Sequence, residues 1–92
     1  MVKFRYRRAV PLDYDTQGHI YFLLRRFHRL DKEEQKKIRE ICRKATGGHS
    51  AAVMEYVTGK RDAEYICGEY YLSPSTLERM VKRLYVALAD VV

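Results

Sequence analysis

The chain has 92 residues, and its formal net charge at neutral pH is +6. This length allows one domain with one modest core, and an apolar fraction of 47% with only two prolines excludes an intrinsically disordered chain. No apolar run approaches the roughly 20 residues of a membrane span, and no secretory signal is visible, so we expect a cytoplasmic protein without membrane segments. In that compartment Cys42 and Cys67 are expected to be buried, reduced thiols. The positive charge suits a polyanionic partner.

Residues 1–14 mix basic and aromatic side chains, and we expect them to form an extended basic arm. Phe4 and Tyr6 alternate with arginines, which also fits a short strand, but no second convincing strand is present to pair with it. Two interpretations stay open: an arm that contacts phosphates or the DNA minor groove, and a solvated terminus whose aromatic side chains pack on the core. The candidate phosphate contacts of the arm are Arg5, Arg7 and Arg8.

The first helix is predicted from Thr16 to Leu30, with Asp15 as its N-cap. The dense β-branched and aromatic residues over His19–Leu24 also fit a strand. The apolar stripe of the helix consists of Ile20, Leu23, Leu24 and Phe27. The opposite face carries Phe22 and three arginines, which fit either phosphate contacts or a solvated cationic surface: Arg25, Arg26 and Arg29.

The second helix is predicted between Asp31, its N-cap, and Gly47-Gly48, which ends it. Its buried stripe consists of Ile38, Ile41, Cys42 and Ala45, and its solvated face of Lys36, Lys37, Arg39 and Glu40. Ser50 is expected to cap a short third helix that reaches about Thr58 and stops at Gly59.

Two further helices are predicted, one running from Asp62, its N-cap, to Tyr70, and one from Pro74 to Leu88 with Ser73 as its N-cap. The last helix has an apolar stripe at helical spacing, formed by Leu77, Val81, Leu84 and Leu88 and widened by Met80 and Ala87. Its opposite face is polar and cationic, with Ser75, Arg79, Lys82 and Arg83 and with Thr76 at the edge.

The stretch from Ile66 to Leu84 resembles the helix-turn-helix of bacterial DNA-binding proteins, in which Ile-Ala-x-x-Leu-Gly-Val-Ser-x-x-Thr-Val is a frequent pattern. The matching positions are Ile66, Cys67, Tyr70, Leu72, Ser73, Thr76 and Leu77. The resemblance implies that the helix beginning at Pro74 enters the DNA major groove. Tyr71 departs from the pattern, because that turn position usually holds a glycine and often needs a positive φ. The whole chain is also faintly similar to small prophage and mobile-element proteins.

Charge is distributed unevenly along the chain. Residues 1–30 hold seven basic against two acidic side chains, residues 31–60 seven against five, and residues 61–92 four against five. Because phosphate contacts dominate DNA affinity, the near-neutral C-terminal third needs another segment to supply positive charge, and the N-terminal third is the candidate.

These observations predict an all-α fold of about five helices in one domain, residues 1–92. It comprises a basic arm (1–14), two buttressing helices (15–48) and a tri-helical helix-turn-helix unit (50–92). The expected function is a small DNA-binding protein, either a transcriptional regulator or a mobile-element accessory factor, that binds double-stranded DNA, and the apolar end hints at a homodimer. The expected DNA contacts are Arg5, Arg7, Arg8, Arg25, Arg26, Arg29, Ser73, Ser75, Thr76, Arg79, Lys82 and Arg83, with Arg79 as the base contact.

Two other functions stay open. A protein-interaction or adaptor module without DNA binding fits the near-neutral C-terminal third and the tyrosine content. Binding of RNA or single-stranded DNA fits the arginines and tyrosines of the N-terminal part. No catalytic constellation, phosphate-binding glycine loop or metal motif is visible, so we expect no enzyme, no cofactor and no small-molecule substrate.

Overall fold

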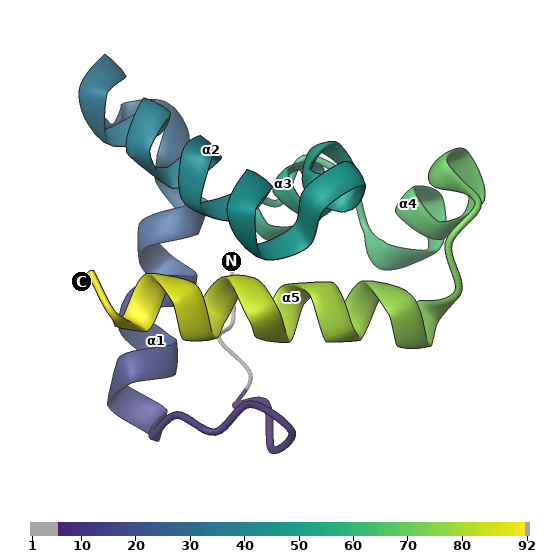
Figure 1. The fold of residues 1–92 in the computed structure, drawn as a ribbon, viewed down its shortest axis with the longest axis horizontal. Coiled ribbons are helices and arrows are strands. Elements are labelled where there is room, and N and C mark those ends of the chain that lie inside the picture. Colours follow the sequence, from purple (N-terminus) through teal and green to yellow (C-terminus); the bar gives the residue numbers. More distant parts are fainter. Residues whose placement is uncertain (1–5, 92) are drawn as a thin grey trace.

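The computed structural model describes residues 6–91, and the regular elements in that range are helical (Figure 1). They are, in chain order, α1 (Tyr14–Arg25), the 3₁₀ turn η1 (Phe27–Arg29), α2 (Lys32–Thr46), the 3₁₀ turn η2 (Gly47–His49), α3 (Ser50–Val57), α4 (Ala63–Tyr70) and α5 (Pro74–Ala89). The predicted all-α class is confirmed. The alternative strand over His19–Leu24 is wrong, because this segment lies within α1. None of these helices is long and apolar enough to cross a bilayer.

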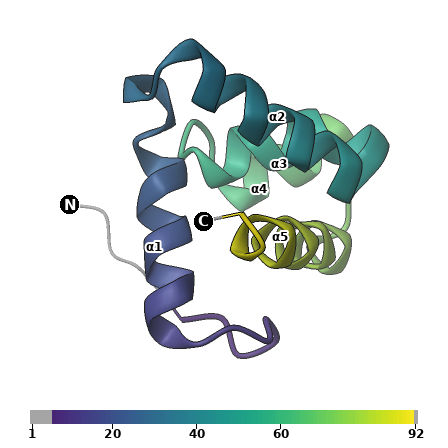
Figure 2. The ribbon, with the colours of Figure 1, turned by 60° about the vertical axis from the view of Figure 1, so that its left-hand side comes forward.

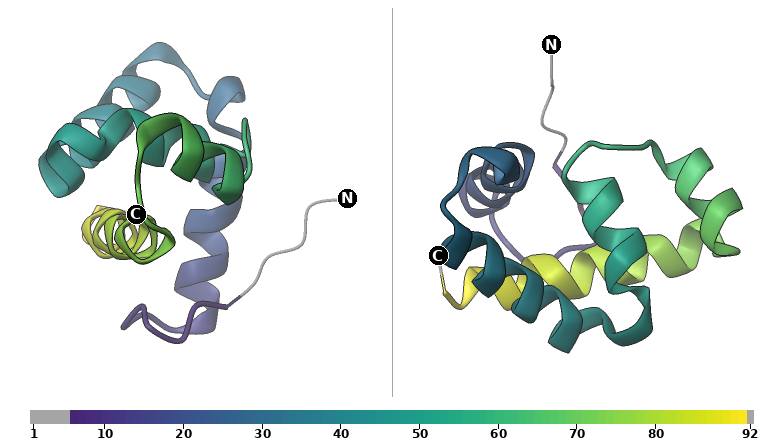
Figure 3. Two further views of the ribbon diagram at one scale, coloured as in Figure 1. Left: turned by 90° about the vertical axis from the view of Figure 1, so that its right-hand side faces the viewer. Right: turned by 90° about the horizontal axis from the view of Figure 1, so that it is seen from above.

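Helix α5 lies at the centre of the packing, in contact with α1, α2, α3 and α4. In Figure 2 it is seen nearly end on, with α1 on one side and α2 and α3 above it, and Figure 3 shows the same arrangement from two further directions. Its buried side chains are Leu77, Met80, Val81, Leu84, Tyr85 and Leu88. Burial of one large apolar side chain contributes about 1.5–3 kcal/mol to the free energy of folding. The buried face of α5 therefore stabilises the fold strongly, and its side chains belong to the same core cluster as those of the other helices.

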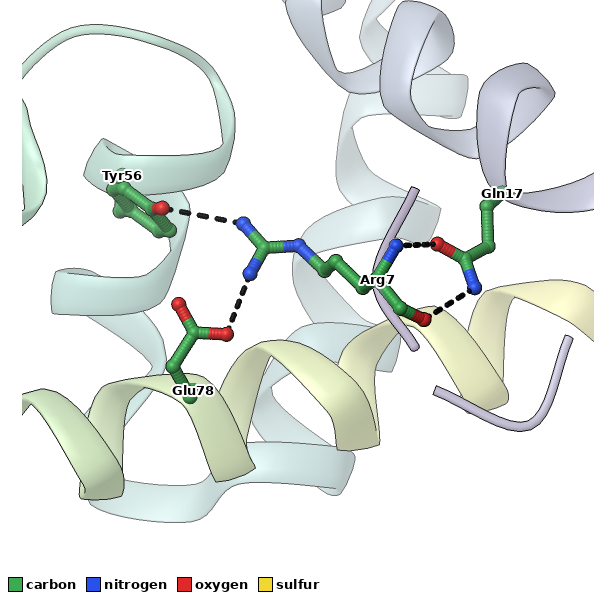
Figure 4. A network of polar contacts seen from close by, with 4 residues as sticks. All are labelled: Arg7, Gln17, Tyr56 and Glu78. Atoms are coloured by element: carbon green, nitrogen blue, oxygen red, sulfur yellow. Dashed lines mark hydrogen bonds and ion pairs between the residues drawn. The ribbon is translucent and has the colours of Figure 1, made fainter. Parts of the chain in front are cut away.

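Residues 6–13 fold back onto the helical body instead of forming the extended arm predicted for this part of the chain. The cause is Gln17, which is fully buried near the start of α1. Its Oε1 accepts the backbone N–H of Arg7 at 2.8 Å, and its Nε2 donates to the carbonyl oxygens of Arg7, Val10 and Leu12 at 2.9, 3.3 and 3.1 Å (Figure 4). One side-chain amide therefore provides hydrogen-bond partners for one N–H and three carbonyl groups of the preceding segment. The rest of the predicted arm, residues 1–5, lies outside the described residues.

Helix α1 begins two residues earlier than predicted, because the N-cap is Asp13 and not Asp15. The Asp13 carboxylate accepts the backbone N–H of Thr16 at 2.7 Å, which satisfies a donor that the first helical turn leaves open. Hydrogen bonds from the Thr16 side chain and backbone lower the pKa of Asp13, because they favour the ionised carboxylate.

Helix α1 also ends earlier than predicted, at Arg25 instead of Leu30. The turn η1 follows and directs Phe27 into the core. The side-chain amide of Gln35 on α2 donates to the carbonyl oxygens of Phe27 and Leu30 at 3.0 and 3.1 Å. A second glutamine thus holds the connection between α1 and α2, as Gln17 holds the segment before α1.

The predicted boundaries of α2 are confirmed, and the predicted cap of α3 is wrong. The Asp31 carboxylate accepts the N–H of Glu34 at 2.8 Å, and Gly47 ends the helix with a φ of 57°. Ser50 is itself helical, with φ −59° and ψ −39°, because η2 runs directly into α3 and leaves no extended residue to act as a cap.

The connection between α4 and α5 contains the predicted caps and an unusual backbone conformation. Asp62 and Ser73 accept the N–H groups of Tyr65 and Thr76 at 2.8 and 3.1 Å. Tyr71 ends α4 in the left-handed region, with φ 55° and ψ 43°, and its side chain is 94% exposed. Among the described residues 6–91, Tyr71 is the only residue other than glycine that has a positive φ. A Cβ in this conformation costs about 1–2 kcal/mol.

Replacement of Gln17 by leucine is expected to lower the free energy of unfolding by about 1–3 kcal/mol, because the Arg7 N–H and the bonded carbonyls lose their partner in a buried place. Urea denaturation followed by circular dichroism measures the loss. Gln35→Leu is the matched control, since it removes the same amide from a half-buried place. A loss for Gln17→Leu no larger than for Gln35→Leu would contradict the role of the buried amide.

Replacement of Tyr71 by glycine is expected to raise the free energy of unfolding by about 1 kcal/mol, because glycine adopts a positive φ without the steric penalty of a Cβ. Tyr71→Ala is the control: it removes the ring but keeps the Cβ, and should bring no comparable gain. Equal stabilities of the glycine and alanine variants, again from urea denaturation, would show that this turn is not strained.

Candidate nucleic-acid interface

The solvent face of α5 carries a cationic stripe beside the last turn of α2. Arg79, Lys82, Arg83 and Val86 are exposed at helical spacing, and with Ala45 of α2 they line a shallow hollow of about 540 Å³. The opposite face of α5 is buried, so these side chains extend into solvent on this side alone. The three basic residues of the stripe are among the predicted DNA contacts, and the fold brings them together.

A second, larger groove of about 640 Å³ lies between α1, α2 and the C-terminal end of α5. Its apolar lining includes Leu23, Ile38 and Leu88. Its charged and titratable lining comes from α1 and α2, and consists of His19, Arg26, Glu34, Lys37, Glu40 and Lys44.

The groove and the hollow follow one another along the contact between α2 and α5, because residues one helical turn apart line them: Ile41 the groove and Ala45 the hollow. Six basic side chains line the two together, against the two carboxylates of Glu34 and Glu40. We call these six the cationic seam: Arg26, Lys37, Lys44, Arg79, Lys82 and Arg83. Positive charge concentrated along one face attracts a polyanion over distances up to the Debye length, about 10 Å at 0.1 M salt.

The N-terminal turn of α5 holds the remaining predicted contacts of that helix. The Ser73 hydroxyl is engaged in the cap and lies 2.9 Å from the Thr76 hydroxyl. The Thr76 hydroxyl also accepts a hydrogen bond from Nη2 of Arg79 at 3.3 Å, which orients an otherwise exposed guanidinium. Ser75 is exposed. Among the predicted contacts of this turn, Ser75 and Arg79 are thus the two that are exposed and are not part of the cap.

Arg7, one of the predicted phosphate contacts, has partners within the protein. Its guanidinium lies 2.5 Å from the Glu78 carboxylate and donates to the Tyr56 hydroxyl at 3.2 Å, so it links the N-terminal segment to α3 and α5 (Figure 4). Burial disfavours the charged form, but the hydrogen bonds to Tyr56 and Glu78 outweigh it and hold the pKa of Arg7 above its ordinary value. Arg8 is exposed, and Arg5 lies outside the described residues.

The arginines of α1 and its following turn separate into two groups. Arg25 is half-buried: its guanidinium lies 5.1 Å from the centre of the Tyr21 ring and fills the space beside Gly59, where a Cβ would come within 2.0 Å of it. Its assignment to a free cationic face is therefore corrected to packing against the loop between α3 and α4. Arg26 and Arg29 are exposed, and Arg26 belongs to the cationic seam.

Two residues of the seam, Lys37 and Lys44, are not among the contacts predicted from the sequence. Their spacing carries a signal, because Lys37, Ile41 and Lys44 recur at i, i+4 and i+7 and so share one side of α2. Periodicity assigns such residues to a common edge of a helix. It does not reveal that α5 packs beside that edge.

The thiols and the other side chains that could ligate a metal lie apart in the described residues. Among residues 6–91, no group of three or more His, Cys, Asp or Glu side chains is placed to hold a metal ion. Both thiols are free, and burial raises the pKa of Cys42, which keeps this thiol protonated and unreactive at neutral pH. Cys42 is buried as predicted, whereas Cys67 is only half-buried.

Comparison with known proteins finds no family model that matches the chain, and no curated protein or solved structure that matches it. The functional argument therefore rests on the positions and charges of the side chains.

Arg7 and Glu78 are expected to be coupled in stability, by up to about 1 kcal/mol, because their side chains are only 25% and 55% exposed. A double-mutant cycle with Arg7→Met and Glu78→Gln, measured by urea denaturation, gives this value. Arg7→Met should change the affinity for random duplex DNA by much less than removal of a seam lysine. If the coupling energy is zero and Arg7→Met binds DNA much more weakly than the unmodified protein, Arg7 is a DNA contact.

Proposed function

We propose that this protein binds double-stranded DNA along the cationic seam, with α4, the turn at Tyr71 and α5 acting as a helix-turn-helix and α5 as the recognition helix. The observation that carries the proposal is the placement of Arg79, Lys82 and Arg83 on the open side of α5, next to the basic edge of α2. A transcriptional regulator or a mobile-element accessory factor is the class of protein that this activity fits.

The start of α5 supports a role in the major groove. Ser73 caps the helix and Pro74 occupies its first position, so the helix begins abruptly and presents its first exposed side chains at its end. Arg79 lies one turn further on and is held at the Thr76 hydroxyl. A guanidinium in such a place can pair bidentately with guanine, and Ser75 can donate to a phosphate or a base edge.

The distribution of charge indicates which residues bind phosphates and which read bases. From Asp62 to Glu78 the chain contains no lysine or arginine, so α4 and the first turn of α5 add little to phosphate binding. Lys37 and Lys44 on α2, and Arg26 directly after α1, supply that charge from outside the motif. Phosphate contacts from these residues fix the position of the protein, and α5 reads the bases.

The second candidate is an adaptor that binds protein and no DNA, which the exposed tyrosines of α4 and its turn favour: Tyr65, Tyr70 and Tyr71. The two functions are separable by experiment, because they use different faces. Neutralising the seam abolishes the first and leaves the second intact.

Replacement of both Lys37 and Lys44 by alanine is expected to weaken binding to random duplex DNA and to lower the salt dependence of log K by about 0.9 for each phosphate that is no longer neutralised. Fluorescence anisotropy between about 50 and 200 mM salt, a range in which phosphate contacts are felt, measures both quantities. Lys36→Ala is the matched control, since Lys36 is an exposed lysine of α2 that lines neither the hollow nor the groove. Equal effects of Lys36→Ala and Lys44→Ala would contradict the seam.

Replacement of Arg79 by alanine is expected to cost about 1–3 kcal/mol on a duplex selected for tight binding, and much less on random duplex, because the guanidinium pairs with a base. The same anisotropy assay on both duplexes measures the difference. An equal reduction of affinity on the two duplexes would leave Arg79 as a phosphate contact and remove α5 from base reading.

A further inference from the structure

The face formed by α4 and its following turn differs in chemistry from the rest of the molecule. The 17 residues from Asp62 to Glu78 contain four acidic and no basic side chains, although the chain as a whole carries a net charge of +6. The same stretch exposes three aromatic rings, with Tyr65 47%, Tyr70 36% and Tyr71 94% accessible. Carboxylates and exposed tyrosines thus occupy a short helix and a turn that contribute little to the core beyond Ile66.

The fold of the monomer gives no reason for a tyrosine at position 71. Its ring contributes no packing to the monomer, because 94% of the residue is exposed. Its backbone has a φ of 55°, at which glycine is more stable than any residue with a Cβ. A large apolar ring held in solvent at such a turn gains its stabilisation from burial against something else, and tyrosine is enriched in the buried centres of protein interfaces.

The contacts within this face indicate which chemistry it accommodates. The guanidinium of Arg61, at the edge of the acidic stretch, lies 4.8 Å from the centre of the Tyr65 ring. The Tyr70 hydroxyl donates to the Glu55 carboxylate at 2.5 Å, which places an aromatic ring and a carboxylate side by side, and this hydrogen bond raises the pKa of Tyr70. Glu64 and Glu69 are exposed on the same helix. Stacking on tyrosine and charge-assisted donation to carboxylates are the two interactions that a guanidinium combines.

We propose that α4 and the Tyr71 turn form a docking surface for a basic, arginine-bearing segment of a protein partner. Charge complementarity carries the choice of occupant: the exposed carboxylates of Glu64 and Glu69 outnumber the one basic side chain of this face, Arg61, so the face attracts arginine and repels phosphates. The proposal does not depend on DNA binding, because it uses other residues on another helix. It adds a protein partner to a protein proposed to bind DNA through the seam, and the turn at Tyr71 joins α4 directly to α5 (Figure 1).

The test uses a fluorescein-labelled peptide of four Arg-Gly-Ser repeats as the probe, with anisotropy as the readout. The Arg-Gly-Ser peptide should bind the whole protein more tightly than its Lys-Gly-Ser counterpart, because lysine stacks on aromatic rings less well. The double variant Tyr65→Ala with Tyr71→Ala should weaken peptide binding at least about tenfold, whereas Tyr71→Phe keeps the ring and should bind nearly as well as the unmodified protein. Glu64→Gln with Glu69→Gln should weaken binding and flatten its salt dependence.

Two controls keep the outcome decisive. Tyr14→Ala removes an exposed tyrosine from α1, outside the proposed face, and should leave peptide binding unchanged. Circular dichroism shows whether each variant is folded. Absence of peptide binding, or equal binding by the arginine and lysine peptides and by the α4 variants, would overturn the proposal. So would a concentration-dependent self-association that Tyr71→Ala abolishes, or a drop in duplex DNA affinity in that variant, since the occupant would then be a second copy or DNA.

Discussion

The broad apolar face of α5 is the constraint on which the other features of the structure depend. Six of its side chains are buried, and four other helices pack against it. Such a helix has one narrow side left for solvent, and its charged residues must lie there. The stripe of Arg79, Lys82 and Arg83 is therefore a consequence of core packing. Because α2 packs against α5, Lys37 and Lys44 of α2 add positive charge to the same side of the molecule, together with the carboxylates of Glu34 and Glu40.

Local sequence signals predict the helices well, and long-range contacts produce the differences. Asp31, Asp62 and Ser73 act as caps because capping needs only a side chain and the next turn of backbone. The extended arm is wrong for residues 6–13 because Gln17 bonds the backbone five to ten residues before it, a contact that no periodicity in the sequence indicates. The ion pair of Arg7 escapes sequence analysis for the same reason: its partner, Glu78, is 71 residues away in the sequence. The three seam residues on α5, and Arg26, are predictable from the sequence, whereas the inclusion of Lys37 and Lys44 on α2 needs the packing.

The molecule separates its charges between two neighbouring faces. The seam gathers basic side chains from three helices, whereas α4 and the start of α5 hold carboxylates and exposed tyrosines. A uniformly basic surface of this size would bind phosphate in many orientations. An acidic face beside the basic one disfavours the wrong orientations, since like charges repel by amounts that matter at short range. Arg7 is paired with Glu78, so its guanidinium is less available to bind phosphate outside the seam.

NMR mapping shows whether DNA contacts the cationic seam. Random duplex DNA is added to the ¹⁵N-labelled protein at low salt, and amide chemical shifts are followed residue by residue. If the seam binds DNA, the largest changes fall on Lys37–Ala45 and on Arg79–Val86, and Glu64–Tyr71 changes little. Changes concentrated on Glu64–Tyr71, or no changes at all on α2 and α5, would contradict DNA binding by the seam.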